Sequence, residues 1–149
     1  METITLGKTG LCVTKTSFGA LPIQRISRAE AVKLVRRAVD GGINYFDTAN
    51  SYTDSEEKLG EALEGVRQKV VISTKSAGKD KKTVLSHIEQ SLRSLRTDYI
   101  DVGFLHCLDE ESDLAAYQAN GVLDYVRALK KQEVIRHIGL SSHTPALVN

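Results

Sequence analysis

The amino-acid sequence predicts an α/β fold in which parallel β-strands alternate with α-helices. Short runs rich in Val and Ile alternate with longer segments whose apolar residues recur at helical spacing. Each of five apolar runs is followed by a small or polar residue, at intervals of 28 to 35 residues. The strands expected on this basis end at Gly19, Asp47, Lys75, His106 and Ser141. We expect a single domain over residues 1–149.

Composition is that of an ordinary globular protein. Of the 149 residues, 41% are hydrophobic and 26% are charged, and the formal net charge is +1. This balance gives no long-range attraction to nucleic acid or membranes, and no signal peptide is expected. Cys12 and Cys107 form neither a CxxC pair nor a Cys/His cluster with zinc spacing, so no metal is expected in this portion. A cytoplasmic protein that binds a small molecule is the simplest expectation.

The amino-terminal third predicts a hairpin, a short strand and a capped helix. Residues 3–6 and 11–13 flank a glycine-bounded turn, as in a β-hairpin. Residues 17–20 are a weak strand candidate. Residues 27–30, Ser-Arg-Ala-Glu, form a capping box that begins a helix, and Gly41-Gly42 ends it.

Strands and helices continue to alternate in the remainder of the chain. The expected strands cover residues 43–47, 70–74, 100–105 and 134–140. The expected helices cover residues 55–63, 85–95 and 122–129, and another begins at Thr144-Pro145. We expect residues 108–120 to be a loop bordering the pocket, with Tyr117 as a ligand contact.

Two parallel architectures compete for this pattern. A doubly wound sheet would carry a GxGxxG turn after its first strand, and residues 19–22 do not supply one. A (β/α)8 TIM barrel places polar groups at the carboxyl ends of several strands, as found here. A complete barrel needs at least about 200 residues. The sequence therefore predicts an incomplete barrel with about five β/α repeats and an N-terminal β-hairpin.

Four side chains at the predicted sheet edge together describe a proton donor. Lys75 ends an apolar strand, where Asp47 on the neighbouring strand would compensate its partly desolvated charge. Tyr52 follows on the loop leaving that strand. A phenol with a pKa of about 10 is a poor acid, and an adjacent ammonium lowers that pKa. His106 adds a group able to orient a carbonyl. Taken singly, each residue has an ordinary structural explanation.

Several ordered motifs across nearly the whole chain resemble the aldo-keto reductase family. The segments that carry the resemblance are residues 42–49, 51–52 and 56–60 for the signature, 72–75 for the lysine strand, 92–101 with His106 for the histidine strand, 135–142 for the fifth strand, and 6–11 for the hairpin that plugs the barrel bottom. Ser141-Ser142 followed by His143 resembles the bacterial branch with iron-sulfur-associated members, whose cluster cysteines lie in a C-terminal extension.

The resemblance implies an oxidoreductase that reduces an aldehyde or ketone with hydride from NAD(P)H. Tyr52 would donate the proton, Lys75 would lower its pKa, Asp47 would hold Lys75, and His106 would orient the carbonyl. NADP(H) is favoured over NAD(H). The residues expected to contact the cofactor are Gly19, Ala20, Asp47, Ser141 and Ser142.

The length of the chain leaves a second hypothesis open. In this family the loops of the last two strands grip the adenosine phosphates, and the 149 residues contain no counterpart of those strands. A truncated, catalytically silent half-barrel could act by self-association through its open sheet edges, or as a nucleotide-sensing subunit. Cys107 is disfavoured as a nucleophile, because adjacent strand residues point to opposite faces. His143 is expected to cap a loop.

Overall fold

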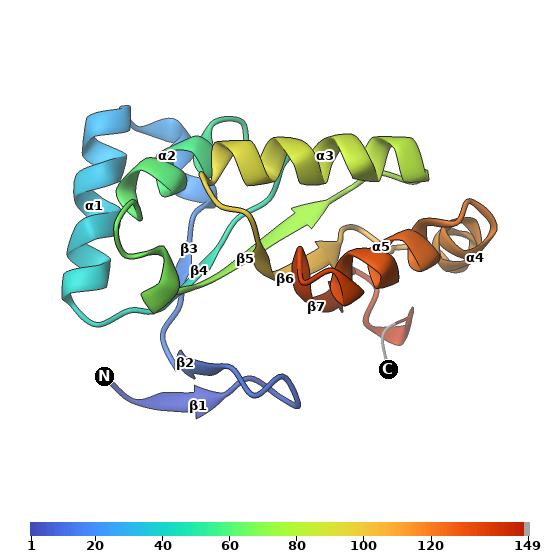
Figure 1. Ribbon diagram of the computed structural model, residues 1–149, viewed down its shortest axis with the longest axis horizontal. Helices are drawn as coiled ribbons and strands as arrows, with labels where there is room; N and C mark the ends of the chain where they lie inside the picture. Colours follow the sequence, from blue (N-terminus) through green and yellow to red (C-terminus); the bar gives the residue numbers. More distant parts are fainter. Residues whose placement is uncertain (148–149) are drawn as a thin grey trace.

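A computed structural model of the protein, which describes residues 1–147, contains one parallel sheet with helices packed against it (Figure 1). Helices α1, α2 and α3 cover one face of the sheet, and α5 lies beside β7. The small hairpin lies apart from the helices. Among the described residues, no helix is long and apolar enough to cross a membrane.

The central sheet has five strands whose spatial order is the same as their order in the chain. They are β3 (Phe18–Gly19), β4 (Tyr45–Asp47), β5 (Val71–Ser76), β6 (Ile100–Leu105) and β7 (Ile135–Leu140), and each pairs in parallel with the next. Parallel neighbours joined by helical crossovers are the wall of a (β/α) barrel. The predicted α/β fold is therefore confirmed as a partial TIM barrel, and β3 and β7 form its edges.

The hairpin closes the amino-terminal end of this sheet. It consists of β1 (Thr3–Thr5) and β2 (Cys12–Thr14), paired antiparallel as predicted. Asn44, just before β4, fixes its position. The amide of Thr14 donates to Asn44 Oδ1 at 2.7 Å, and Asn44 Nδ2 donates to the Cys12 carbonyl at 3.0 Å.

The four helices predicted before Thr144 form close to their expected places. The predicted capping box starts α1, because the Glu30 amide donates to Ser27 Oγ at 3.3 Å and the Ser27 amide donates to Glu30 Oε2 at 3.1 Å. Gly42, with a φ of 89°, turns the chain out of that helix. The helices are α1 (Arg28–Asp40), α2 (Ser55–Ala62), α3 (Lys81–Ser94), α4 (Glu111–Ala119) and α5 (Val122–Lys131).

Helix α4 occupies most of the segment predicted as a loop. Its apolar residues are consecutive, from Leu114 to Tyr117, so they form no periodic stripe. Its start also lacks the Ser or Thr that usually marks a helix N-terminus. Asp113 caps it instead, by accepting the Asp109 amide at 2.9 Å and the Glu110 amide at 3.2 Å. Tyr117 is fully buried rather than exposed to a ligand.

Two further expectations on helices need correction. The helix expected over residues 85–95 begins earlier, at Lys81, where Asp80 caps it by accepting the Thr83 amide at 3.0 Å. The predicted helix at Thr144-Pro145 is present only as a 3₁₀ turn over Pro145–Leu147, and its continuation lies outside the described residues.

Two apolar clusters fill the space between helices and sheet. The first packs α1 and α2 against β4 and β5, around Phe46, Leu59 and Ile72. The second packs α3 and α5 against β6 and β7, around Ile100 and Ile135. The apolar sides of the strands thus face the helices, as in the outer layer of a barrel.

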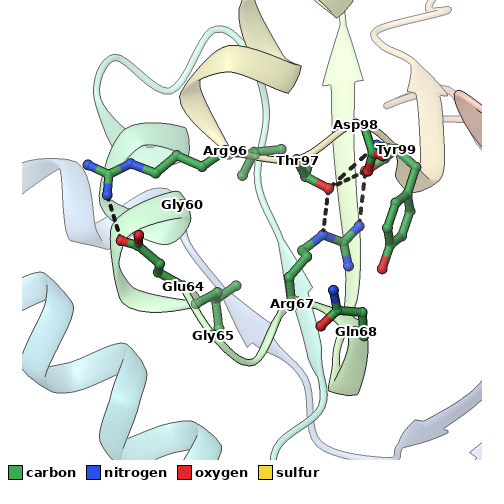
Figure 2. A pocket seen from close by; sticks show the side chains of 11 residues that line it. Gly60, Glu64, Gly65, Arg67, Gln68, Arg96, Thr97, Asp98 and Tyr99 are labelled. Carbon is green, nitrogen blue, oxygen red and sulfur yellow. Dashed lines mark hydrogen bonds and ion pairs between the residues drawn. The ribbon is translucent and has the colours of Figure 1, made fainter.

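A network centred on Arg67 ties the amino-terminal ends of β5 and β6 together (Figure 2). Arg67 borders a hollow of about 490 Å³. Its guanidinium donates to Asp101 Oδ2 at 2.7 Å, to Thr97 Oγ1 at 3.2 Å and to the Val70 carbonyl at 3.1 Å, and it lies 4.0 Å from the centre of the Tyr99 ring. Because these donors already bond groups within the chain, we interpret the hollow as part of the packing between strands and not as a ligand site.

Gly60 lies where α2 meets the end of α3, and we predict that Gly60→Ala destabilises the fold. An added Cβ would overlap the Ser94 carbonyl oxygen and lie 2.8 Å from the Leu95 carbonyl carbon, so backbone would have to move. Overpacking of this kind costs about 1–3 kcal/mol, measurable by urea unfolding. In the matched control Gly19→Ala, the Cβ meets no atom within 4 Å. Equal stability of both variants would contradict the prediction.

Candidate active site

The register of the parallel strands brings the predicted polar residues to one edge of the sheet. Asp47 is the last residue of β4 and pairs with Ser73 on β5. Lys75 follows two residues later on the same face of β5 and pairs with Phe104 on β6. His106 comes directly after β6, where its amide donates to the Ser76 carbonyl at 2.9 Å. Three of the four predicted catalytic residues therefore lie on adjacent strand ends.

Asp47 and Lys75 form a close, half-buried ion pair. Lys75 Nζ lies 2.6 Å from Asp47 Oδ2 and donates to the Thr48 carbonyl at 2.6 Å. The second carboxylate oxygen of Asp47 accepts from Ser73 Oγ at 2.5 Å. The lysine side chain is only 11% exposed, so these two acceptors replace water around the ammonium. The sequence analysis expected Asp47 to hold Lys75, and the two side chains lie in contact as an ion pair.

Tyr52 lies beside this pair on the loop between β4 and α2. Its ring centre is 5.3 Å from Lys75 Nζ, and its amide donates to the Ala49 carbonyl at 3.0 Å. Burial raises the pKa of the Tyr52 phenol, and the charges of Asp47 and Cys107 add to that rise. The net shift in this arrangement is therefore upward, opposite in direction to the lowering by Lys75 that the sequence suggested.

His106 is held by Ser141, which follows β7. Ser141 Oγ lies 2.7 Å from His106 Nδ1 and accepts from the Cys107 amide at 3.3 Å. Burial lowers the pKa of His106, and the nearby Lys75 charge lowers it further. The imidazole is therefore neutral at pH 7 and can both accept and donate a hydrogen bond.

The residues expected to contact a cofactor lie at the carboxyl ends of three strands. Gly19 pairs with Asp47 in the β3–β4 register, and the Ala20 amide donates to the Asp47 carbonyl at 2.8 Å. The space above Gly19 is open. Ser141 is engaged with His106, and Ser142 Oγ donates to Asp109 Oδ1 at 3.3 Å. In the sheet order, Gly19 and Ala20 belong to one edge and the two serines to the other.

Ser73 and the Thr48 carbonyl were not anticipated as parts of the site. The strand period of two places Ser73 on the same face as Lys75, so its contact with Asp47 could have been expected. No sequence signal identifies the Thr48 carbonyl, because any residue type supplies that group.

Comparison with known proteins identifies the protein family of this chain. The model of the Aldo/keto reductase family matches residues 14–149. The chain therefore belongs to the aldo/keto reductase family.

Individual relatives agree with this assignment. The chain is 33% identical to L-galactose dehydrogenase of Arabidopsis thaliana, over 95% of this chain and 48% of that protein. It is 28% identical to L-glyceraldehyde 3-phosphate reductase of Escherichia coli K12, over 93% of this chain and 44% of that protein. The chain thus spans about half the length of the curated relatives it matches.

Solved structures show the same likeness. An aldo-keto reductase from Bacillus halodurans in its holo form superposes with a TM-score of 0.81 at 29% identity, over 99% of this chain and 52% of that one. An aldo/keto reductase from Klebsiella pneumoniae in complex with NADP and acetate gives a TM-score of 0.73 at 27% identity, over 93% and 48% of the two chains.

We predict that His106 titrates below the value of about 6.5 that is usual for histidine. Because its folded pKa is lowered, the unfolded chain binds this proton more readily. His106 therefore contributes stability that is fully present above about pH 6.5 and is lost as the pH falls toward the folded pKa. Histidine chemical-shift titration measures this, with the signal assigned by its loss in His106→Gln. A His106 pKa at or above about 6.5 would refute the prediction.

Proposed function

We propose that this chain carries the proton-transfer half of an NAD(P)H-dependent reductase of aldehydes or ketones, with Tyr52 as the proton donor. One observation carries the proposal. The Asp47–Lys75 pair, with 2.6 Å between Nζ and Oδ2, lies beside the Tyr52 ring at the strand ends where barrel enzymes hold their chemistry. Membership of the aldo/keto reductase family supports the reaction class.

The raised pKa of Tyr52 keeps the phenol protonated but makes it a weaker acid, so proton transfer from it requires that the resulting phenolate be stabilised. As the carbonyl oxygen gains negative charge, the phenol O–H transfers its proton to it and leaves a phenolate. The Lys75 ammonium, 5.3 Å from the ring centre, stabilises that phenolate electrostatically. A reduced nicotinamide, when bound, supplies the hydride to the carbonyl carbon.

His106 would orient the substrate through its second ring nitrogen. Ser141 Oγ accepts from the Cys107 amide, which leaves its own O–H free to donate to His106 Nδ1. The neutral imidazole then carries its proton on Nε2 and can donate it to the carbonyl oxygen. Ser141 is thus a positioning residue in this proposal.

The cofactor would lie across the strand ends, and its chemistry fits the residues present. The open space above Gly19 lets a flat ring approach the backbone next to Asp47. Ala20, Ser141 and Ser142 would complete the contacts. We favour NADP(H), because the similar Klebsiella pneumoniae structure is in complex with NADP.

A second candidate function has its own structural support. Strands β3 and β7 each have one neighbour within the described sheet. Unpaired edges of a parallel sheet are templates for pairing with another chain. A catalytically silent half-barrel that forms a homo-oligomer through these edges is therefore our alternative, as is a nucleotide-sensing subunit.

We predict that this chain oxidises NADPH in the presence of a reactive aldehyde and that Tyr52→Phe lowers kcat by about 10²–10⁴-fold, the usual contribution of a general acid. The phenylalanine keeps the ring near Lys75 and removes only the proton. Absorbance of the reduced cofactor measures turnover.

Tyr125→Phe on α5 is the matched control and should leave turnover unchanged. Turnover that survives Tyr52→Phe would exclude Tyr52 as the acid. NADPH binding without turnover would favour the sensing subunit, and the absence of both in a folded oligomer would favour the silent half-barrel.

If self-association uses the β7 edge, Leu140→Pro should reduce it. The Ser141 amide points toward β6, where it donates to the Leu105 carbonyl at 3.0 Å, so the preceding amide of Leu140 points to the open edge. Proline removes that edge donor and keeps the β6–β7 ladder. Analytical ultracentrifugation should show a lower mass at equal concentration. Leu140→Val keeps the amide and should associate like the wild type; equal association of the proline variant would exclude this edge.

A further inference from the structure

Three side chains with metal-binding groups converge beside the tetrad, on two loops far apart in the sequence. Cys107 and Asp109 lie on the loop after β6, and His143 lies on the loop after β7. One ligand atom from each, the cysteine sulfur, a carboxylate oxygen and an imidazole nitrogen, lies within 4.8 Å of the other two. None of the three belongs to the tetrad.

Hydrogen bonds between the two loops hold these groups in place. The His143 amide donates to Asp109 Oδ1 at 2.6 Å, and Thr144 Oγ1 donates to the Asp109 carbonyl at 3.0 Å. The Leu108 amide donates to the Ser141 carbonyl at 2.9 Å. These bonds hold the two loops side by side and so bring the three ligand groups near one another.

Cys107 reaches this cluster because the chain leaves the strand geometry at that residue. Its φ is 59°, in the left-handed region, so the alternation of an extended strand does not decide where its sulfur points. Lys79 Nζ donates to the Cys107 carbonyl at 3.0 Å. That ammonium also pairs with Asp113 at 2.8 Å, which offsets its repulsion of a cation.

The distances suit a small tetrahedral ion. His143 Nδ1 and Asp109 Oδ2 lie 3.0 Å apart. Zinc bonds of about 2.0–2.3 Å place tetrahedral ligands roughly 3.3–3.6 Å from one another. Because all three separations are within 4.8 Å, zinc binding requires the ligand atoms to move together by at most about 1.5 Å. The His143 side chain is 78% exposed and free to make that adjustment.

We propose that Cys107, Asp109 and His143 form a site for Zn²⁺, with a water molecule as the fourth ligand. A thiolate and an imidazole favour zinc over the oxygen-preferring Mg²⁺ and Ca²⁺. The site replaces our sequence-based expectation of no metal in this portion. Spacing alone does not reveal it, because its ligands come from two loops joined only in the fold. It stands independently of the proposed reductase activity.

The test is Zn²⁺ titration of the reduced chain by isothermal calorimetry, with Co²⁺ as a spectroscopic probe. We expect one zinc per chain, and for Co²⁺ the visible bands of a tetrahedral ion with a near-ultraviolet thiolate charge-transfer band. Cys107→Ser and His143→Gln should each weaken Zn²⁺ binding by at least about tenfold, since even outer-shell changes cost metal sites 10–100-fold. Circular dichroism checks that both variants fold.

The chain provides matched controls in Cys12→Ser on the hairpin and His137→Gln on β7, which should bind Zn²⁺ like the wild type. Zinc binding that is unchanged in Cys107→Ser, or a Co²⁺ spectrum without a thiolate band, would overturn the proposal. So would a loss of affinity in Cys12→Ser equal to that in Cys107→Ser.

Discussion

The ion pair between Asp47 and Lys75 is the contact on which the arrangement of the strand ends depends. One carboxylate oxygen holds the ammonium at 2.6 Å and the other holds Ser73 at 2.5 Å, so Asp47 fixes two residues on the same face of β5. On the opposite face of that strand, buried Thr74 donates to Glu56 of α2 at 2.6 Å. A slip of one residue would exchange these faces and leave a lysine among the apolar residues under the helices. The contacts of Asp47 therefore favour the observed register of β5, and that register in turn places Lys75 at the site.

The amino-terminal ends of the strands carry a second polar network with a different task. Asp101 accepts the Ile72 amide at 2.9 Å and pairs with Arg67 at 2.7 Å and with Arg136 at 3.2 Å, which links β5, β6 and β7. A buried ion pair adds little net stability, because desolvation offsets attraction. The effect of this network is to fix how neighbouring strands align. The carboxyl ends of the strands stay available for chemistry, as is usual in barrels. The hollow beside Arg67 belongs to this structural end.

Sequence reasoning succeeded where one local pattern determines the outcome. Apolar runs ending at Lys75 and His106 predicted both the strands and the edge where their side chains meet. It failed where the outcome depends on neighbours. The consecutive apolar residues of α4 show no helical period, and in this fully described helix Tyr117 is the one buried residue. The left-handed φ of Cys107 invalidated the argument from strand alternation. The direction of the Tyr52 pKa shift depends first on burial and then on the charge of Asp47, and sequence spacing gives neither.

In the proposed function, the residues for proton transfer and most of those for cofactor contact lie on different strands of the sheet. The tetrad lies on β4, β5 and β6 and their loops, each with neighbours on both sides, so its geometry is set by contacts inside the chain. Gly19 and Ala20 belong to one outer edge, and Ser141 and Ser142 to the other. Apart from Asp47, the residues proposed to hold a nicotinamide therefore lie at the two edges of the described sheet. Because Ser141 also holds His106 at 2.7 Å, the β7 edge affects both the proposed cofactor contacts and the orientation of one member of the tetrad.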